Sequence, residues 1–577
     1  MSARRTETLE EAFGDAWDPA NPLGHRAILA ADERSEPFAA GERVLDAYGL
    51  NAEFVPTGLG GRLDRLDRLA RTLRPVFRRD ASMGVGYGVT GFIAGVGVWA
   101  EGTPEQQRRV ADILLSGRRM AAAHTELAHG SDMGRNALRA EPAADGGLLL
   151  TGGKQMINNL GRADAAIMLA RTGDAPGSRS HSLVLAGLDG ARAGLRHRPR
   201  LTTSALRGSQ MGAADFDGLA VPPGSIVGRP GHGLEGIMRA FQVTRSVLPG
   251  MMLGTLDTEL RCALSFALER RLYGRRVGDL PHARSVLAGA LADMLVCDSI
   301  ATVAARALHV VPAQGSVLSG LAKYLVADLA QGVSQRLAVL LGARSFLRDG
   351  PYGIFQKMMR DLPVVSIAHA GGVVCRASVI PQLPSLARNG WRTPGPSPDA
   401  LFLLDGDLPP LDLGRLELTA RGADHVLSVL TAEPVPGTPA ELADLCAAFA
   451  GELKRMADVQ IAPRDRVVTA GPEAFALAAR YAAVLGAAAC VGVWRANRRT
   501  GDPLTADPAW VVLALHRLAV RIGLPVAATP AGVTEAVFDR LVRRRAQHRS
   551  FDLYGDPLAG QPPHLPAEPS HPGVMTP

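Results

Sequence analysis

The chain has 577 residues, of which 47% are hydrophobic, 21% charged and 5% aromatic. This length exceeds what one hydrophobic core usually supports, so we expect about two to four folding units in a protein that buries large cores. A net charge of +7 is a mild excess over this length, and the sparse aromatics argue against a stacking platform for single-stranded nucleic acid. Five scattered cysteines form no CxxC pair, so no disulfide framework or zinc site is predicted.

Residues 1–120 are predicted to form a helical domain. "TPEQQRRVADILLSG" (103–117) begins at a threonine cap and ends at a glycine, as a helix does. The uncharged stretch 81–100 imitates a membrane span, but its six glycines favour a buried helix. Residues 1–20 contain no apolar core of a secretory signal, so the expected location is the cytoplasm.

The pattern of apolar and polar residues then changes along the chain. In residues 121–228 short apolar runs are broken by Gly, Asp and Asn, which predicts a small β domain. Helical periodicity returns in 229–390 and predicts a helical bundle. Residues 391–411 are rich in Pro, Gly and Ser and are predicted to be a linker. An extra helical module is expected in 412–557, followed by a disordered tail at 558–577.

The densest positive charge is "RLVRRRAQHR", residues 540–549. It could meet a phosphate, an acidic carrier protein or a membrane surface. A solvated face near the C-terminus of a helix explains it more simply, because cations there suit the helix dipole. We therefore expect no membrane contact and no nucleic acid partner.

Four motifs occur in order: "HTELAHGSD" (124–132), "GGKQMINN" (152–159), "LRGSQMGAADFDGLAVP" (206–222) and "ALERRLYGRRV" (267–277). With the domain textures, they resemble the acyl-CoA dehydrogenase family over roughly residues 40–385. The resemblance implies an α+β fold with an N-terminal helical domain, a central β-barrel-like domain and a four-helix bundle, to which this chain adds a C-terminal helical domain. It also implies FAD, an acyl thioester on CoA or acyl carrier protein, an electron-transfer flavoprotein as possible partner, and a homodimer.

The resemblance assigns the flavin contacts by motif position. Thr125 would hydrogen-bond the flavin pyrimidine edge, and Ser131 would lie on the flavin and thioester side of the β domain. Met156 and Asn158 are candidate contacts on the strand that crosses near the flavin N5 edge. The chain departs from the family at Leu127, where proline is common. The alternative for Thr125 and Ser131 is ordinary turn chemistry, since both residue types favour turns and caps.

A second set of cofactor contacts is implied further along the chain. Arg270 matches an arginine that reaches the flavin pyrophosphate of a neighbouring subunit, and a guanidinium suits phosphate. This would complete the site across an interface, so at least a dimer is expected. Tyr273 matches an adjacent aromatic, and Gly342 matches part of a Gly-rich turn. The alternative for Arg270 is a surface ion pair with Glu269 or another nearby acid.

Aligned without a gap, "RDLPVVSIAHAGGVVCR" (360–376) places His369 at the position of the family's catalytic glutamate. The other family position for the base falls at Thr244, which is not a base. Neutral imidazole, with an ordinary pKa of about 6.5, could remove the α proton of a thioester. The implied reaction is FAD-dependent oxidation to an α,β-unsaturated thioester. A flavin-dependent monooxygenase of the same fold, or a silent thioester-binding protein, stays open. No metal site is predicted.

Overall fold

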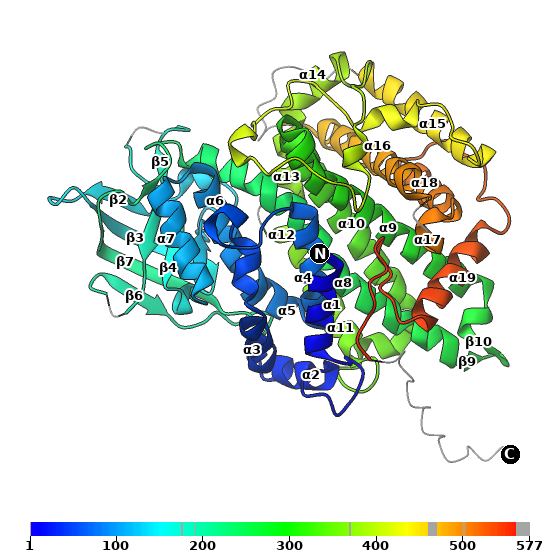
Figure 1. Cartoon of the computed structure of the whole chain (residues 1–577), viewed down its shortest axis with the longest axis horizontal. Helices are drawn as coiled ribbons and strands as arrows, with labels where there is room; N and C mark the ends of the chain where they lie inside the picture. The colour runs from blue at the N-terminus through cyan, green and yellow to red at the C-terminus, as the bar shows by residue number, and fades with distance from the viewer. Residues whose placement is uncertain are drawn as a thin grey trace.

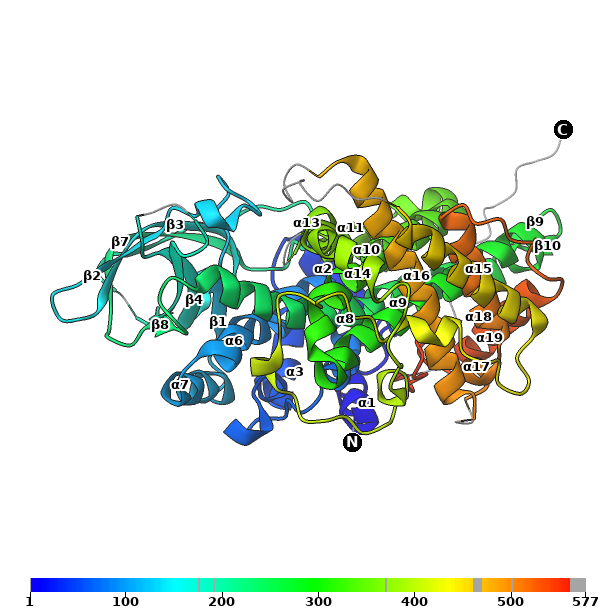
Figure 2. The ribbon, with the colours of Figure 1, turned by 90° about the horizontal axis from the view of Figure 1, so that it is seen from above.

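A computed structural model of the protein describes residues 2–174, 177–190, 192–368, 371–459, 470–499 and 502–560. The chain order is helices, a sheet, long helices and a further set of helices (Figure 1). The sheet lies at one end of the molecule, and the long helices separate it from the C-terminal helices (Figures 1 and 2). The predicted α+β fold class is confirmed.

The N-terminal region is helical, as predicted. Its helices are α1 (Ser2–Phe13), α2 (His25–Glu33), α3 (Ala39–Tyr48), α4 (Leu66–Arg79), α5 (Ala81–Met83), α6 (Thr90–Glu101) and α7 (Pro104–Leu115). Thr103 and Gln106 form a reciprocal capping box at the start of α7. Residues Gly84–Gly88 form a π-helical turn before α6, and such turns are frequent at functional sites.

Among the described residues, four segments are long and apolar enough to cross a membrane by length and composition: Ala81–Glu101, Pro281–Val310, Gly353–Arg388 and Pro472–Asn497. The most apolar window is 89% buried in the first of them, 94% in the second and 72% in the fourth. The protein's own core therefore accounts for most of the apolar surface of these three segments.

The β domain contains one sheet with the strand order β6-β7-β3-β2-β4-β5-β8, and β1 pairs in parallel with β4. The strands are β1 (Met120–Ala123), β2 (Arg139–Pro142), β3 (Leu148–Asn158), β4 (Ala165–Arg171), β5 (His181–Gly187), β6 (Leu195–Arg198), β7 (Met211–Val221) and β8 (Ile226–Val227). The long antiparallel pair β3 and β7 has a bulge between Gln155 and Ile157. A bulge re-aims the side chains around it, and this one falls inside the "GGKQMINN" motif.

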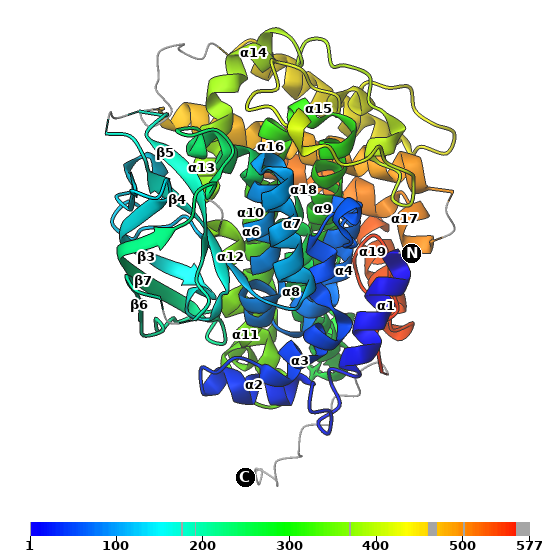
Figure 3. The ribbon, with the colours of Figure 1, turned by 60° about the vertical axis from the view of Figure 1, so that its left-hand side comes forward.

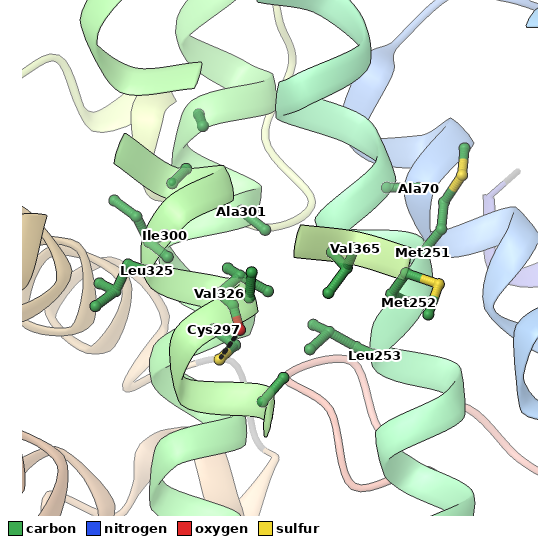
Figure 4. Close-up of a cluster of buried hydrophobic side chains, with 14 of the residues drawn as sticks. Ala70, Met251, Met252, Leu253, Cys297, Ile300, Ala301, Leu325, Val326 and Val365 are labelled. Atoms are coloured by element: carbon green, nitrogen blue, oxygen red, sulfur yellow. Dashed lines mark hydrogen bonds between the residues drawn. The ribbon is translucent and has the colours of Figure 1, made fainter. Parts of the chain in front are cut away.

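Three long helices form the centre of the molecule. They are α8 (Gly233–Glu269), α9 (Pro281–Val310) and α10 (Gly315–Leu341), followed by α11 (Gly353–Asp361), α12 (Val364–Ile367), α13 (Gly372–Val379) and α14 (Leu383–Arg388). Side chains from α8, α9, α10 and α12 meet in one apolar cluster (Figure 4). Val365 of α12 is 4% exposed, so this short helix is anchored in the bundle. Between α8 and α9 the chain forms a hairpin of β9 (Arg271–Leu272) and β10 (Arg275–Arg276).

The C-terminal helices pack on α9 and α10. They are α15 (Ala440–Ala457), α16 (Pro472–Asn497), α17 (Pro503–Ala506), α18 (Ala509–Arg521) and α19 (Val533–Ala546). Figure 3 shows α17, α18 and α19 on the side of the bundle away from the sheet, while α16 runs across the bundle. In α19, the side chain of Arg544 donates to Asp502 over 2.8 Å and that of Arg545 to Ser265 over 3.1 Å. The basic cluster 540–549 therefore contributes internal contacts that attach this helix to its neighbours.

The segment 391–411 packs closely on the bundle although its composition is that of a linker. Trp391 and Phe402 are buried, and the Arg306 guanidinium donates to the carbonyl of Ala400 over 2.7 Å and to that of Gly406 over 3.1 Å. Most of the predicted disordered tail, residues 561–577, lies outside the described residues.

Candidate functional site

A buried ion pair organises the loop that carries the "HTELAHGSD" motif. Lys154, fully buried on β3, donates to Glu126 over 2.8 Å. The backbone N–H groups of Ala137 and Leu138 also donate to this carboxylate, over 2.7 and 3.1 Å. Burial alone would raise the pKa of Glu126, but the Lys154 charge and these hydrogen bonds lower it overall. Glu126 is thus an anionic anchor of the loop.

Burial lowers the pKa values of two basic side chains next to Glu126, those of Lys154 and His124. Burial lowers the pKa of Lys154 to about 8, although Glu126 opposes the shift. Burial, helped by the Lys154 charge, lowers the pKa of His124 to about 3, so this imidazole is neutral at neutral pH. Its ring lies edge-on to Phe241 of α8, with 6.5 Å between centroids, and it therefore joins the β domain to the bundle.

Thr125, Met156 and Asn158 come together at one edge of the β domain. The Thr125 carbonyl accepts a bond from the Gln155 backbone N–H over 3.3 Å. Met156 lies at the bulge with a φ of 57° and is 39% exposed. Asn158 donates to the Val85 carbonyl over 2.8 Å and so ties β3 to the π-helical turn. Ser131 is exposed in the turn after the same loop.

Two features of this edge suit a polar ligand that stacks on it. A side chain such as that of Met156 is uncommon at positive φ, and such backbone strain clusters at ligand sites. The Oδ1 atom of Asn158 is buried and makes no hydrogen bond within the protein. A buried amide oxygen without a donor is costly, and a ligand N–H would satisfy it.

Arg270 and Tyr273 lie between α8 and α9, and Gly342 lies at the end of α10. Arg270 follows directly after α8, and Tyr273 is 92% exposed in the hairpin turn with a φ of 53°. Gly342 ends α10 with a φ of 60°, and open space surrounds the position of a Cβ atom there. The β9–β10 hairpin lies at the end of the molecule opposite the β domain, so one chain does not bring Arg270 and Tyr273 to the edge that carries Thr125 (Figures 1 and 2).

His369 lies outside the described residues, between α12 and α13. The bundle next to these helices contains two buried cations that sequence reasoning missed. Burial lowers the pKa of Lys323 on α10 to about 8, and the charge of Arg245 on α8 adds to that effect. Both cations interact electrostatically with Cys375 of α13. Positive charge at this place would stabilise negative charge that develops beside α13.

The missed residues left only weak signals in the sequence. Lys323 is the single charge in the apolar run "GLAKYLV", and Arg245 follows Thr244 in a stretch that we considered for a base. Thr244 is 1% exposed, and its hydroxyl donates to the Phe241 carbonyl over 3.4 Å. Within the described ranges, no group of three or more His, Cys, Asp or Glu side chains is arranged to hold a metal.

A helical domain is followed by a β domain and then by a helical bundle. This order, with the motif loop 124–132 tied to β3, defines an acyl-CoA dehydrogenase type of fold. Residues 121–219 match the family domain described as acyl-CoA dehydrogenase, middle domain, and residues 231–372 match acyl-CoA dehydrogenase, C-terminal domain. These two matches span less than half of the chain, and they assign the two segments to domains of the acyl-CoA dehydrogenase type.

Curated relatives agree with this assignment. The chain is 24% identical to the mitochondrial very long-chain specific acyl-CoA dehydrogenase of Homo sapiens over 65% of its own length and 56% of that protein. It is 27% identical to the human mitochondrial short-chain specific enzyme over 59% of its length and 81% of that protein. The match thus spans little more than half the length of the very long-chain relatives.

Solved structures share the fold. Butyryl-CoA dehydrogenase of Megasphaera elsdenii superimposes with a TM-score of 0.59 at 18% identity, over 64% of this chain and 96% of that one. The prolyl acyl carrier protein oxidase AnaB gives 0.57 at 15% identity, over 66% and 97%. About a third of this chain lies beyond the shared fold, and the added C-terminal helices belong to that part.

Proposed function

We propose that this protein is an FAD-dependent oxidoreductase that converts an acyl thioester into its α,β-unsaturated form. The proposal depends on the arrangement of residues at one edge of the β domain. There Thr125 is bonded to Gln155, Met156 has a positive φ, and Asn158 contacts the helical domain through its amide nitrogen while its Oδ1 has no donor among the described residues. The chain also matches the middle and C-terminal domains of acyl-CoA dehydrogenases. Bound FAD would supply an isoalloxazine ring that accepts hydride from the β carbon.

The chain's own residues would divide the work of binding. Thr125 and Asn158 would hold the polar edge of the flavin, and the exposed hydroxyl of Ser131 would lie near the junction of flavin and thioester. Lys154 and Glu126 would fix the loop that carries these groups. Lys323 and Arg245 would favour negative charge on the thioester oxygen as the α proton leaves.

The second group of residues supports a homodimer. Arg270 and Tyr273 flank strand β9, and the β9–β10 hairpin lies at the end of the molecule opposite the β domain, so the same chain would not bring them to a flavin held by that domain (Figure 1). A second copy could present them, with Arg270 as the ligand for the pyrophosphate. In the chain on either side of Gly342, Val339 is 80% exposed, Phe346 84% and Leu347 47%, and apolar surface of this kind favours burial by a partner.

We propose His369 as the base that removes the α proton. It replaces the family's glutamate in register, and neutral imidazole suits proton removal near neutral pH. The substrate would be carried on CoA or on the phosphopantetheine of an acyl carrier protein. The prolyl acyl carrier protein oxidase among the structural neighbours supports the carrier, and the very long-chain and short-chain relatives support CoA.

The test is anaerobic mixing of the flavin-loaded protein with acyl-CoA or acyl carrier protein thioesters. Loss of the oxidised-flavin absorbance at a substrate-dependent rate supports dehydrogenation. His369→Ala should lower that rate by about 100-fold while FAD binding is kept, and His197→Ala, an exposed histidine on β6, should leave it unchanged. An equal rate in both variants removes His369 from the mechanism.

The same experiment separates the other functions. Activity that requires oxygen and a separate reductase would replace dehydrogenation with a monooxygenase reaction. A protein that never takes up FAD would be a thioester-binding or partner protein. Reduced flavin that passes electrons to an electron-transfer flavoprotein, and not to oxygen, would identify the acceptor.

A further inference from the structure

A cavity of about 400 Å³ that is open to solvent on one side lies between the C-terminal helices, outside the domains shared with the family. Its walls come from α15 and α16, and residues 429–438 close one side. Leu442, Val491 and Trp494 supply apolar surface, and Cys446 also lines it. The volume lies within the range of small-molecule sites, which are mostly apolar with a few polar groups.

The space exists because one face of α15 carries very small side chains. Ala443, Ala447, Ala450 and Gly451 recur at helical spacing and all line the cavity opposite Val491 of α16. Larger side chains at these positions would fill the space between the two helices. The space is open to water on one side, and a linear hydrocarbon chain bound in it would remove apolar surface of both the hydrocarbon and the cavity from water.

The polar rim of the cavity is positive. Lys454 and Arg495 line it, and no Asp or Glu is among its lining residues. A neighbouring cavity of about 530 Å³ shares Arg495 and adds Arg498 and Arg499, against one acid, Asp399. Cations near the end of α16 also suit its helix dipole, but the dipole does not explain why they border an apolar space. A guanidinium beside such a space matches a carboxylate on an alkyl chain.

We propose that this cavity is a second ligand site, which binds a single-chain carboxylate such as decanoate with its chain between α15 and α16 and its carboxylate at Arg495. The site is independent of thioester oxidation, because none of its lining residues lies in the family domains that end at residue 372.

Cys446 gives a local measure of occupancy. It is partly exposed, whereas the four other free cysteines are buried. Burial raises the pKa of its thiol to about 11, so alkylation is slow enough to time. Decanoate, below its aggregation concentration, should slow alkylation of Cys446 by N-ethylmaleimide at least fivefold in the full-length protein. Acetate and decyltrimethylammonium at the same concentration should not.

Calorimetry of the same full-length protein supplies the second measurement. Decanoate should bind with a Kd of about 0.1 mM. Arg495→Gln should weaken binding about five- to tenfold, and Ala447→Phe should abolish binding by filling the cavity. Arg543→Gln, which removes the same charge from an exposed position on α19, should have no effect. Arg495→Gln alone suffices if Ala447→Phe does not fold.

Three results would overturn the proposal. Decanoate that neither protects Cys446 nor releases heat would show no site. Equal protection by decyltrimethylammonium would show that charge is not recognised. Protection by vesicles of phosphatidylcholine and phosphatidylglycerol but not by free decanoate would show a lipid surface instead. None of these results depends on thioester oxidation, so failure here leaves the proposed function untouched, and the reverse also holds.

Discussion

Buried charge is treated in opposite ways in two regions of this molecule. Beside α4, the Arg74 guanidinium contacts the carboxylates of both Asp298 and Asp552, the latter over 2.9 Å, and all three side chains are at most 2% exposed. In the middle of α8, Glu259 is equally buried, yet neither of its carboxyl oxygens makes a hydrogen bond of normal length. The Arg74 charge is thus paired with carboxylates. The Glu259 carboxyl has no cationic partner in the part of the chain that the structure describes, and it keeps its proton at neutral pH instead.

The paired region teaches that the end of the described chain is part of the core. Residues 549–560 return along α4 and α8, and Arg71 donates to Asp556 over 2.9 Å. The Tyr554 ring lies 4.2 Å from the Arg71 guanidinium carbon, and the Leu553 N–H donates to Asp298 over 2.8 Å. Helices that lie beyond the family fold are therefore joined to it by a segment that neutralises its arginines.

The largest effect is expected from removing this segment. A chain that ends at His548 loses Asp552 and Asp556 and leaves Arg71 and Arg74 buried with fewer acids. Breaking a buried pair costs about 3–5 kcal/mol, and two are broken here, so we expect no stable soluble protein. A chain that ends at Gly560 should keep its midpoint of thermal unfolding. Equal yields and midpoints for the two truncations would show that the segment does not stabilise the core.

The next effect concerns Glu259, whose pKa burial raises to about 8. An unfolded glutamate ionises near pH 4.5, whereas the folded one keeps its proton up to about pH 8. Unfolding between these values releases a proton, so this group makes stability fall as pH rises from about 4.5 to 8. Glu259→Gln should remove that fall, so the stability of the variant relative to wild type should be about 4 kcal/mol higher at pH 8 than at pH 4.5.

The measurement is urea unfolding of wild type and Glu259→Gln at several pH values. Glu433→Gln, at an exposed position, should follow the wild-type curve. Asp552 changes the stability with pH in the opposite direction to Glu259. Burial alone would raise its pKa, but Arg74 and Arg78 lower it overall, so its contribution is lost as pH falls below about 4. Parallel wild-type and Glu259→Gln curves would mean that the carboxyl is already charged in the folded protein.

Sequence reasoning succeeded where the signal was local. The capping box at Thr103 and the change from helical to strand texture depend on residues a few positions apart. It could not pair Arg74 with Asp552 or Lys154 with Glu126, because nothing local specifies a contact between distant segments. Composition likewise suggested a linker around Trp391, although that side chain is 1% exposed.

For the candidate site, motif order placed Thr125, Met156 and Asn158 on neighbouring segments, but their roles did not follow from order alone. The structure adds that Asn158 ties β3 to the helical domain and that Met156 is strained. Lys323 escaped notice because a single lysine in an apolar helix looks like a surface residue that snorkels to water. Only tertiary packing shows that it is buried.

The smallest effect is expected from an exposed ion pair, which should contribute much less to the free energy of unfolding than the buried pairs do. Arg34 and Glu36 lie 2.7 Å apart, but their side chains are 59% and 55% exposed. Water screens their attraction, and holding two long side chains in place opposes it, so Arg34→Ala should lower stability by at most about 0.5 kcal/mol. A double-mutant cycle with Glu36→Ala isolates the pair. A coupling energy as large as that of Arg74 with Asp552 would mean that burial does not set the difference between these pairs, because the geometry of the two contacts is similar.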